Sequence, residues 1–323
     1  MRCPDCWLDM RARLWEAFPA MNLLRLTVLV FGVFACSTAV IFIKMSGLHP
    51  MLLAAFRLLV AAAVLSPLCA RDMRRHELSF RRLPWRETFL PAVLLAIHFM
   101  TWIVGARMTA AANASLIVNM VPVAMPFLAR ERITRGEIVG TLMATTGIVF
   151  LAAADYHIGW DTFVGDLICF VSMFFFAAYL AAGRRSRRIP GMWPFIVPLY
   201  AVAGALCLVA AWPFVSPIRP YAGREILLVL ALGIVPTVLG HSSLLYSMKH
   251  LRSQVVAIGT LGQFIFAGIM AYLIFSETPL WTFYLACVLL LSGAIVAIRS
   301  PGQAAIRCKA TKQHQSRELG RKP

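Results

Sequence analysis

The chain has 323 residues, of which 60% are apolar and 14% are charged, and its mean hydropathy is +0.76. Soluble domains average about 45 to 50% apolar and about 25% charged residues, so this chain has too little polar surface for a water-soluble globule and belongs in a bilayer. The net charge of +17 would indicate nucleic-acid binding if the basic residues formed one patch, but they are spread over short gaps between apolar runs.

Ten apolar runs are long enough to cross about 30 Å of hydrocarbon as helices that rise about 1.5 Å per residue. The gaps between them are too short to hold a soluble catalytic or regulatory domain. The sequence therefore predicts an all-α integral membrane protein with ten transmembrane helices. They are expected at Leu24–Ile43, Met51–Leu68, Phe89–Ala106, Ala111–Ala129, Ile138–Ala154, Phe163–Gly183, Trp193–Phe214, Ile226–Met248, Val255–Phe275 and Trp281–Ile298.

The basic residues outside these runs predict the orientation of the chain. Counted along the ten spans, 26 of them fall on the side of the N-terminus and 4 on the other side. Basic residues in short loops mark the cytoplasmic side, so a multi-pass protein of the plasma (inner) membrane with both termini in the cytoplasm is expected. Residues 1–21 and 300–323 are then cytoplasmic tails, and no signal peptide is predicted because no small-residue cleavage site follows the first apolar run.

The two halves of the chain resemble each other at a nearly constant offset. Pro50 and Pro194 are 144 residues apart at the starts of two predicted helices, and His98 and His241 lie 143 residues apart inside two others. Glu131 and Glu277, which are 146 residues apart, lie at the ends of a third pair of predicted helices. This predicts two five-helix repeats, 22–155 and 156–299. Because five is odd, the second repeat enters the membrane from the opposite side, so the repeats are inverted, as in carriers that work by alternating access.

Four stretches of the sequence resemble the drug/metabolite transporter superfamily, specifically its ten-helix EamA-type members. They are HFMTWIVGARMTAAANASLIVNMVPV, RERITRGEIVGTLMATTGIVFL, VGDLICFVSMFFFAAYLAAGRRSRR and GHSSLLYSMKHLRSQVVA. The resemblance covers about residues 24–298. It implies a secondary transporter with a central cavity between the third and fourth and the eighth and ninth helices, and many such proteins export amino acids or other small metabolites.

Arg57 is the one basic residue deep inside a predicted span, since Arg25 lies at the very start of the first one. Charged groups at membrane depth are costly and often line substrate pathways, so Arg57 is a candidate ligand for an anionic group such as a substrate carboxylate, or for a gating ion pair. The alternative is a structural hydrogen bond to helix carbonyls. Its place about 9 Å below the start of the helix also predicts a side chain that snorkels partway towards the outer surface.

His98 and Trp102 are four residues apart and therefore share one face of the third predicted helix. An imidazole beside an aromatic wall suits substrate binding or proton transfer, and the recurrence of a histidine at His241 favours such a role. A buried histidine that only packs is the alternative. No metal or other cofactor is predicted, because two histidines without a third protein ligand do not make a zinc site.

The fourth predicted helix carries a polar stripe with two prolines, which predicts a broken helix that faces the centre of the protein. Asn119 of this stripe falls at the repeat offset within one residue of Gln263, so amides are expected on both pseudo-symmetric helices. They either bind substrate or join helices through hydrogen bonds. The stripe is Ser115, Asn119, Pro122 and Pro126, and further lining residues are Asn113 and Thr260. Gly136, Gly140, Ala144 and Gly147 predict close helix packing alone.

These features favour a secondary transporter that moves a small polar or amphipathic metabolite, with efflux as the expected direction. Its expected partners are the substrate, the lipid bilayer and, where transport is coupled, a proton or ion; a homodimer is compatible with the sequence, and nucleic acid is not a partner. An intramembrane enzyme is a weaker alternative because the spans hold no paired carboxylates and no HExxH or GxSxG motif. A channel or a membrane scaffold is the third alternative.

Overall fold

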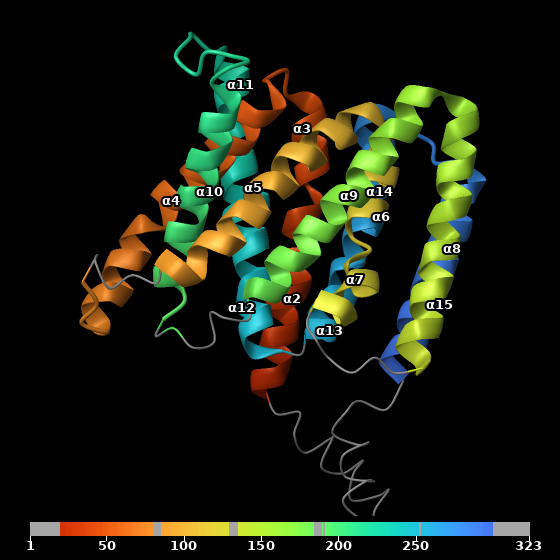
Figure 1. Ribbon diagram of the computed structural model, residues 1–323, viewed down its shortest axis with the longest axis horizontal. Coiled ribbons are helices and arrows are strands. Elements are labelled where there is room, and N and C mark those ends of the chain that lie inside the picture. The colour runs from red at the N-terminus through yellow and green to blue at the C-terminus, as the bar shows by residue number, and fades with distance from the viewer. Residues whose placement is uncertain are drawn as a thin grey trace, which may run out of the picture.

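The computed structural model describes residues 20–79, 85–128, 135–183, 189, 191–251 and 253–299, and every regular element among them is a helix. Figure 1 shows these helices as one bundle. A bilayer core offers the backbone no water, and a helix satisfies its own amides and carbonyls, which is why such apolar runs become helices. The helices are α2 (Ala20–Ser37), α3 (Ala39–Met45), α4 (Pro50–Arg75), α5 (Trp85–Met108), α6 (Ala111–Val118), α7 (Val121–Leu128), α8 (Arg135–Ile158), α9 (Trp160–Gly183), α10 (Trp193–Ala211), α11 (Gly223–Leu232), the π-helix η3 (Gly233–His241), α12 (Ser242–His250), α13 (Ser253–Thr260), α14 (Gly262–Phe275) and α15 (Trp281–Arg299).

The predicted spans fall on helical segments of two kinds. Six segments of the described chain are long and apolar enough to cross a membrane, and four further apolar helices are shorter. The six are Leu24–Met45, Pro50–Arg75, Trp85–Met108, Trp160–Gly183, Trp193–Ala211 and Gly223–His250, and the four are Ala111–Met125, Ile138–Leu151, Gly262–Phe275 and Trp281–Gly293. The all-helical, membrane-spanning fold is therefore confirmed, whereas the number of ten crossings stays a prediction.

The fourth predicted span is broken where its prolines predict a break. α6 ends at Val118 and α7 begins at Val121, with Pro122 in the first turn of α7. Pro122 has no amide hydrogen to donate to the carbonyl one turn earlier, so the ladder of α6 cannot continue through it. The amide of Met120 instead bonds the Ile117 carbonyl, a tighter turn that ends α6.

Three other predicted spans contain interruptions that the apolar pattern does not indicate. α2 gives way to α3 at Thr38, whose hydroxyl donates to the Ala35 carbonyl at 2.8 Å; such bonds compete with the helix ladder. α13 and α14 are separated at Leu261, close to Gly259 and Gly262. The eighth span widens into η3 around Pro236. These departures come from local hydrogen bonding and helix contacts, which a hydropathy pattern does not encode.

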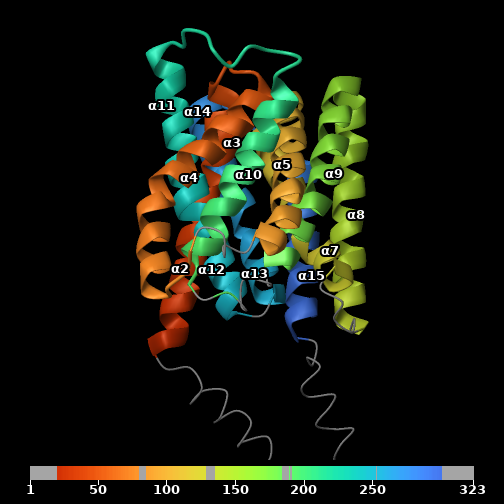
Figure 2. The ribbon, with the colours of Figure 1, turned by 60° about the vertical axis from the view of Figure 1, so that its left-hand side comes forward.

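The helices pack in pairs that join the two halves of the chain. α4 lies along α10, α5 along α9 and α8 along α15, while α2 lies against η3 and α12. The halves also meet where α6 contacts α14 and α7 contacts α13. Figures 1 and 2 place α8 and α15 side by side at one edge of the bundle. The core is therefore built mainly between the halves.

The close packing of α8 against α15 depends on glycine. A Cβ on Gly293 would lie 2.5 Å from the Gly140 carbonyl oxygen, and a Cβ on Gly147 would lie 3.1 Å from the Ala286 Cα. Backbones that approach this closely tolerate only the smallest side chains. The packing role predicted for Gly140 and Gly147 is confirmed.

The two ends of the described chain lie on the same face of the bundle. α2 begins and α15 ends at what we call the N-terminal face (Figure 2). The turn between α3 and α4, residues 46–49, lies on the other face, and the chain also turns there between α8 and α9 (Figure 1). We call this the turn face. Glu131, one point of the predicted repeat, lies outside the described residues.

Candidate functional site

Arg57 lies in the middle of the bundle, on α4, and its side chain is fully buried. Its Nε donates a hydrogen bond to the Thr237 hydroxyl oxygen at 3.0 Å, and its guanidinium carbon lies 4.0 Å from the centroid of the Phe99 ring. Nη1 and Nη2 are buried and have no hydrogen-bond partner among the described residues. The sequence predicts a side chain that snorkels partway towards the outer surface, and this prediction is wrong because the guanidinium is fully buried. It points into the core, where the Phe99 ring and Thr237 hold it.

Thr237 reaches Arg57 because η3 approaches α4 closely. A Cβ on Gly233 would lie 2.7 Å from Val60 Cγ1 and 3.1 Å from the Arg57 carbonyl oxygen, so glycine is required at this contact. The Thr237 hydroxyl donates its hydrogen to the Leu232 carbonyl at 2.8 Å. Its oxygen is then left to accept from Arg57 Nε. The π-helix therefore supplies a polar anchor that orients the guanidinium from across the bundle.

His98 lies one turn from Trp102 on α5, and the two rings stack with centroids 5.9 Å apart. On its other side His98 stacks on Phe176 of α9 at 4.7 Å. His98 Nδ1 lies 2.9 Å from the Ser172 hydroxyl oxygen, and this hydroxyl donates to the His98 carbonyl at 2.9 Å. Because the serine hydrogen goes to that carbonyl, Nδ1 is assigned as the donor to Ser172, and Nε2 is the ring nitrogen left to accept.

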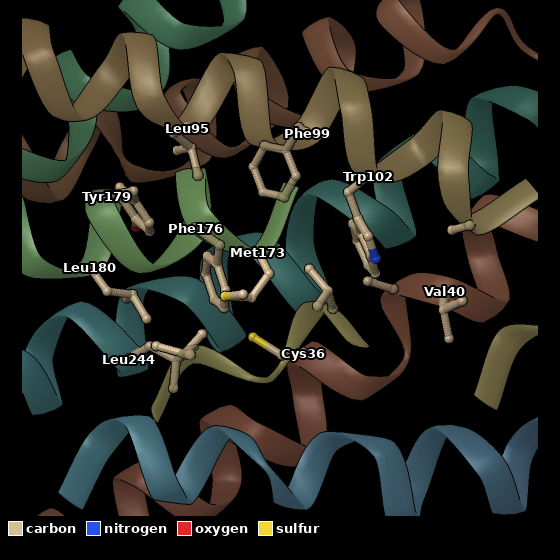
Figure 3. Close-up of a cluster of buried hydrophobic side chains, with 14 of the residues drawn as sticks. Cys36, Val40, Leu95, Phe99, Trp102, Met173, Phe176, Tyr179, Leu180 and Leu244 are labelled. Atoms are coloured by element: carbon tan, nitrogen blue, oxygen red, sulfur yellow. The ribbon is translucent and has the colours of Figure 1, made fainter. Parts of the chain in front are cut away.

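His241 completes the cluster from the end of η3. Its ring contacts Phe99 at 5.1 Å and Phe176 at 5.6 Å, so both predicted histidines contact the same two phenylalanines. His241 Nδ1 is buried without a hydrogen-bond partner. Figure 3 shows Phe99 and Trp102 facing Phe176 and Met173 from the opposing helix. We call Arg57, His98, Trp102 and His241, together with Phe99 and Phe176, the central cluster.

The structure thus brings together four of the eight residues that the sequence analysis singles out. The remaining four are buried at or near the interrupted helices. Asn119 follows the end of α6, where its Nδ2 donates to the Ser115 carbonyl at 2.8 Å while Oδ1 has no partner. Gln263 lies in the first turn of α14 with Nε2 unpartnered. The remaining members are Asn113 and Thr260, and the Thr260 hydroxyl donates to the Ala257 carbonyl at 2.6 Å.

Several residues of the site are absent from the sequence-based predictions. Phe99, Phe176, Ser172 and Thr237 hold the predicted residues in place, yet each looks like an ordinary span residue in the sequence. A signal exists for Thr237 alone, because Pro236 and two nearby glycines mark a distorted helix. The phenylalanines become recognisable only when α5 is placed against α9.

Replacing Asn119 by leucine separates a binding role from a structural one. The change removes the bond to the Ser115 carbonyl and also an unpartnered buried oxygen, so we expect the free energy of unfolding to change by no more than about 1 kcal/mol. If Asn119 contacts the transported molecule, transport falls at least about tenfold. Thermal unfolding and flux are measured together, with Thr146→Leu on α8 as the control, since that exposed threonine bonds its own helix in the same way. Unchanged flux would assign Asn119 to helix packing.

On the turn face an ion pair joins helices from both halves. Lys44 Nζ on α3 lies 2.8 Å from Glu277 Oε1, and the amide of Ala111 at the start of α6 donates to Glu277 Oε2 at 2.8 Å. Glu277 can reach both groups because Ser276 adopts a left-handed conformation, with φ of 55°, and turns the chain at the end of α14. A carboxylate at a helix N-terminus is favourable, so Glu277 stabilises two contacts at once.

The turn at residues 46–49 is held by a second set of charged groups. Arg107 donates to the Ser46 carbonyl at 2.8 Å and to the Leu48 carbonyl at 2.7 Å. Glu225 accepts from the Ser46 hydroxyl at 2.6 Å and from the Gly47 amide at 2.9 Å. Charged groups from α5 and α11 therefore fasten this turn.

Apolar grooves on the surface include two that Arg57 does not line. One, of about 500 Å³, runs between α14 and α15 and is lined by groups such as Ile269, Tyr272 and Phe283. The other, of about 200 Å³, lies between α4 and α11. Such apolar grooves on a membrane protein suit lipid chains. Among the described residues, no cluster of three histidine, cysteine or carboxylate side chains is placed to hold a metal ion.

Comparison with known proteins identifies the family. The EamA-like transporter family matches residues 24–153 and again residues 163–299, so two copies of the same unit account for most of the chain. A solved chain described only as "Crystal structure of protein" superposes with a TM-score of 0.65 at 20% sequence identity, covering 84% of this chain and 96% of that chain, which shows a shared fold. No curated protein matches the sequence. The chain belongs to the EamA-like transporter family, within the drug/metabolite transporter superfamily, and it carries two EamA repeats.

Proposed function

We propose that this protein is a secondary transporter that moves small metabolites across the plasma membrane by alternating access, with ten transmembrane helices arranged as two inverted repeats. The family supports a transporter and a non-enzymatic role. The observation that carries the proposal is the central cluster. It places a buried cation and two histidines at the meeting point of α4, α5, α9 and η3, which come from both repeats.

The packing of the helices supports the inverted repeat. In the two repeats, α2 and α3 correspond to α9, and α5 corresponds to the segment of α11, η3 and α12. The contact of α2 with η3 and α12 therefore corresponds to the contact of α9 with α5, and both contacts are present. The same correspondence maps the pairs α4 with α10 and α8 with α15 onto themselves. This is the behaviour of two units related by a two-fold axis. An axis in the membrane plane lets one central site face the two sides in turn.

The proposed orientation places the N-terminal face in the cytoplasm, because most basic residues lie on that side. The turn face is then external, and the Lys44–Glu277 ion pair and the fastened 46–49 turn close it to the outside. We propose efflux as the direction. Transport is then driven by coupling to a proton or ion, by exchange, or by the substrate gradient alone.

The first experiment compares metabolites released by cells that express the wild type with those released by cells that carry an empty vector. Untargeted mass spectrometry of the medium is expected to find compounds that accumulate only with the wild type. Each compound is then tested for counterflow in proteoliposomes that hold the purified full chain. Saturable, temperature-sensitive counterflow supports a carrier, whereas unsaturable flux indicates a channel. Neither release nor counterflow in any arm would contradict the proposal.

A further inference from the structure

We propose that the central cluster binds a monocarboxylate that carries no ammonium group, with the carboxylate on Nη1 and Nη2 of Arg57. This inference deepens the proposed function, since it names the class of substrate that the same site takes. It rests on three observations: the charge of the site, the free edge of the guanidinium, and the nature of the groups that surround it.

The charge of Arg57 has no counter-charge among the described residues that surround it. The guanidinium is fully buried, and none of the carboxylates among the described residues forms an ion pair with it. The polar and titratable groups that face it carry no negative charge in their ordinary states. They are Cys36 on α2, His98 on α5, Tyr200 and Cys207 on α10, and Thr237 and His241 on η3. A buried unpaired charge is strongly unfavourable, and an anionic ligand would neutralise it.

The free edge of the guanidinium fits a carboxylate. Nε is occupied by Thr237, and the Phe99 ring covers one face of the group. The remaining edge presents Nη1 and Nη2 together, both buried and without partners. Two parallel N–H groups match the two oxygens of one carboxylate, which is the geometry that arginine recognises best. One guanidinium balances one negative charge, so a monoanion suits the site better than a phosphate dianion.

The surroundings of Arg57 disfavour an ammonium group. The ammonium of a free amino acid would need a carboxylate or several acceptors at this depth. The site instead presents the guanidinium of Arg57 itself, no carboxylate among the described residues, and a wall of rings from Phe99, Trp102 and Phe176. That wall suits an apolar or aromatic body. The chemistry therefore favours a simple organic acid over the amino acid with the same side chain.

The test uses pairs of probes that differ by one group, with the full chain in lipid nanodiscs. One set is 3-phenylpropanoate, phenylalanine and 3-phenylpropanamide, and the other is 4-methylpentanoate, leucine and 4-methylpentanamide, with inorganic phosphate as a further anion. Protection against thermal unfolding is followed as a function of concentration. We expect at least one of the two acids to protect at concentrations at least about tenfold lower than its amino acid, its amide and phosphate.

Substitution of Arg57 provides the second arm. Arg57→Lys keeps the charge and loses the paired N–H groups, so protection by the acid should weaken at least about tenfold. Arg219→Ala, which removes an exposed arginine on the turn face, should leave protection unchanged. If the Arg57 variant does not fold, which its unfolding midpoint without probe reveals, the selectivity of the wild type among the matched probes still decides the question.

Two outcomes would overturn the inference: equal or better protection by the amino acids, amides or phosphate, or no protection by either acid. Counterflow of the protecting acid in proteoliposomes is measured separately. An acid that binds through Arg57 without being transported would contradict the proposed function and leave the binding site standing. Counterflow of an unrelated compound, with no binding of either acid, would support the proposed function and overturn the inference about the site.

Discussion

Replacing Gly293 by alanine is expected to destabilise the protein more than the same change at Gly147 or Gly268. The new Cβ would lie 2.5 Å from the Gly140 carbonyl oxygen, so two backbones would have to separate. Overpacking of this kind costs about 1–3 kcal/mol. The cost arises where α8 and α15 pack against each other through glycine, and no flexible side chain can move aside to relieve it.

Two other glycines serve as graded controls. A Cβ on Gly147 would lie 3.1 Å from Ala286 Cα, whereas a Cβ on Gly268 would have its nearest neighbours at 3.9 Å, an ordinary contact. Alanine is the better helix former, so Gly268→Ala should be neutral or stabilising. Unfolding in detergent or nanodiscs should rank the losses as Gly293, then Gly147, then Gly268. A loss at Gly268 as large as that at Gly293 would mean that helix contact distance does not set the cost.

The double variant Lys44→Glu with Glu277→Lys, which exchanges the two charges, is expected to restore only part of the stability that Glu277→Lys alone loses. The single change places two ammonium groups together and removes the acceptor of the Ala111 amide. A hydrogen bond to a charged group contributes about 1.5–3 kcal/mol, and a cation at a helix N-terminus is unfavourable. Lys44→Glu combined with Glu277→Lys re-forms an ion pair of the opposite sense and leaves the α6 N-terminus next to a cation.

The measurement is a double-mutant cycle on unfolding, read together with labelling of Cys36 by a membrane-impermeant thiol reagent. Cys36 is buried beside the central cluster, so its labelling from outside reports opening of the turn face. Glu277→Lys should raise the labelling rate and lower stability, and the exchange should recover part of both. Glu87→Gln, which removes an exposed carboxylate from α5, is the control. Full recovery by the exchange would show that the bond to α6 contributes nothing.

The site was only partly predictable from the sequence, for reasons that individual residues illustrate. Arg57 and His98 stand out because charged and polar groups are rare within apolar spans. The broken helix at Asn119 follows from Pro122, since a missing amide hydrogen acts on its own turn. The bond from Arg57 to Thr237 joins residues 180 positions apart and could not be predicted in this way.

The sequence by itself determined that the chain is a helical membrane protein with two related halves, and it marked the polar residues at membrane depth. Hydropathy and repetition are properties of single segments and of their order along the chain. The tertiary structure alone decided that Arg57 points into the core, that Phe99 and Phe176 bring the two histidines together, and that Glu277 caps α6 while pairing with Lys44. These contacts depend on which faces of helices from different halves meet, and helix packing sets those faces through groups such as Gly233 and Gly293.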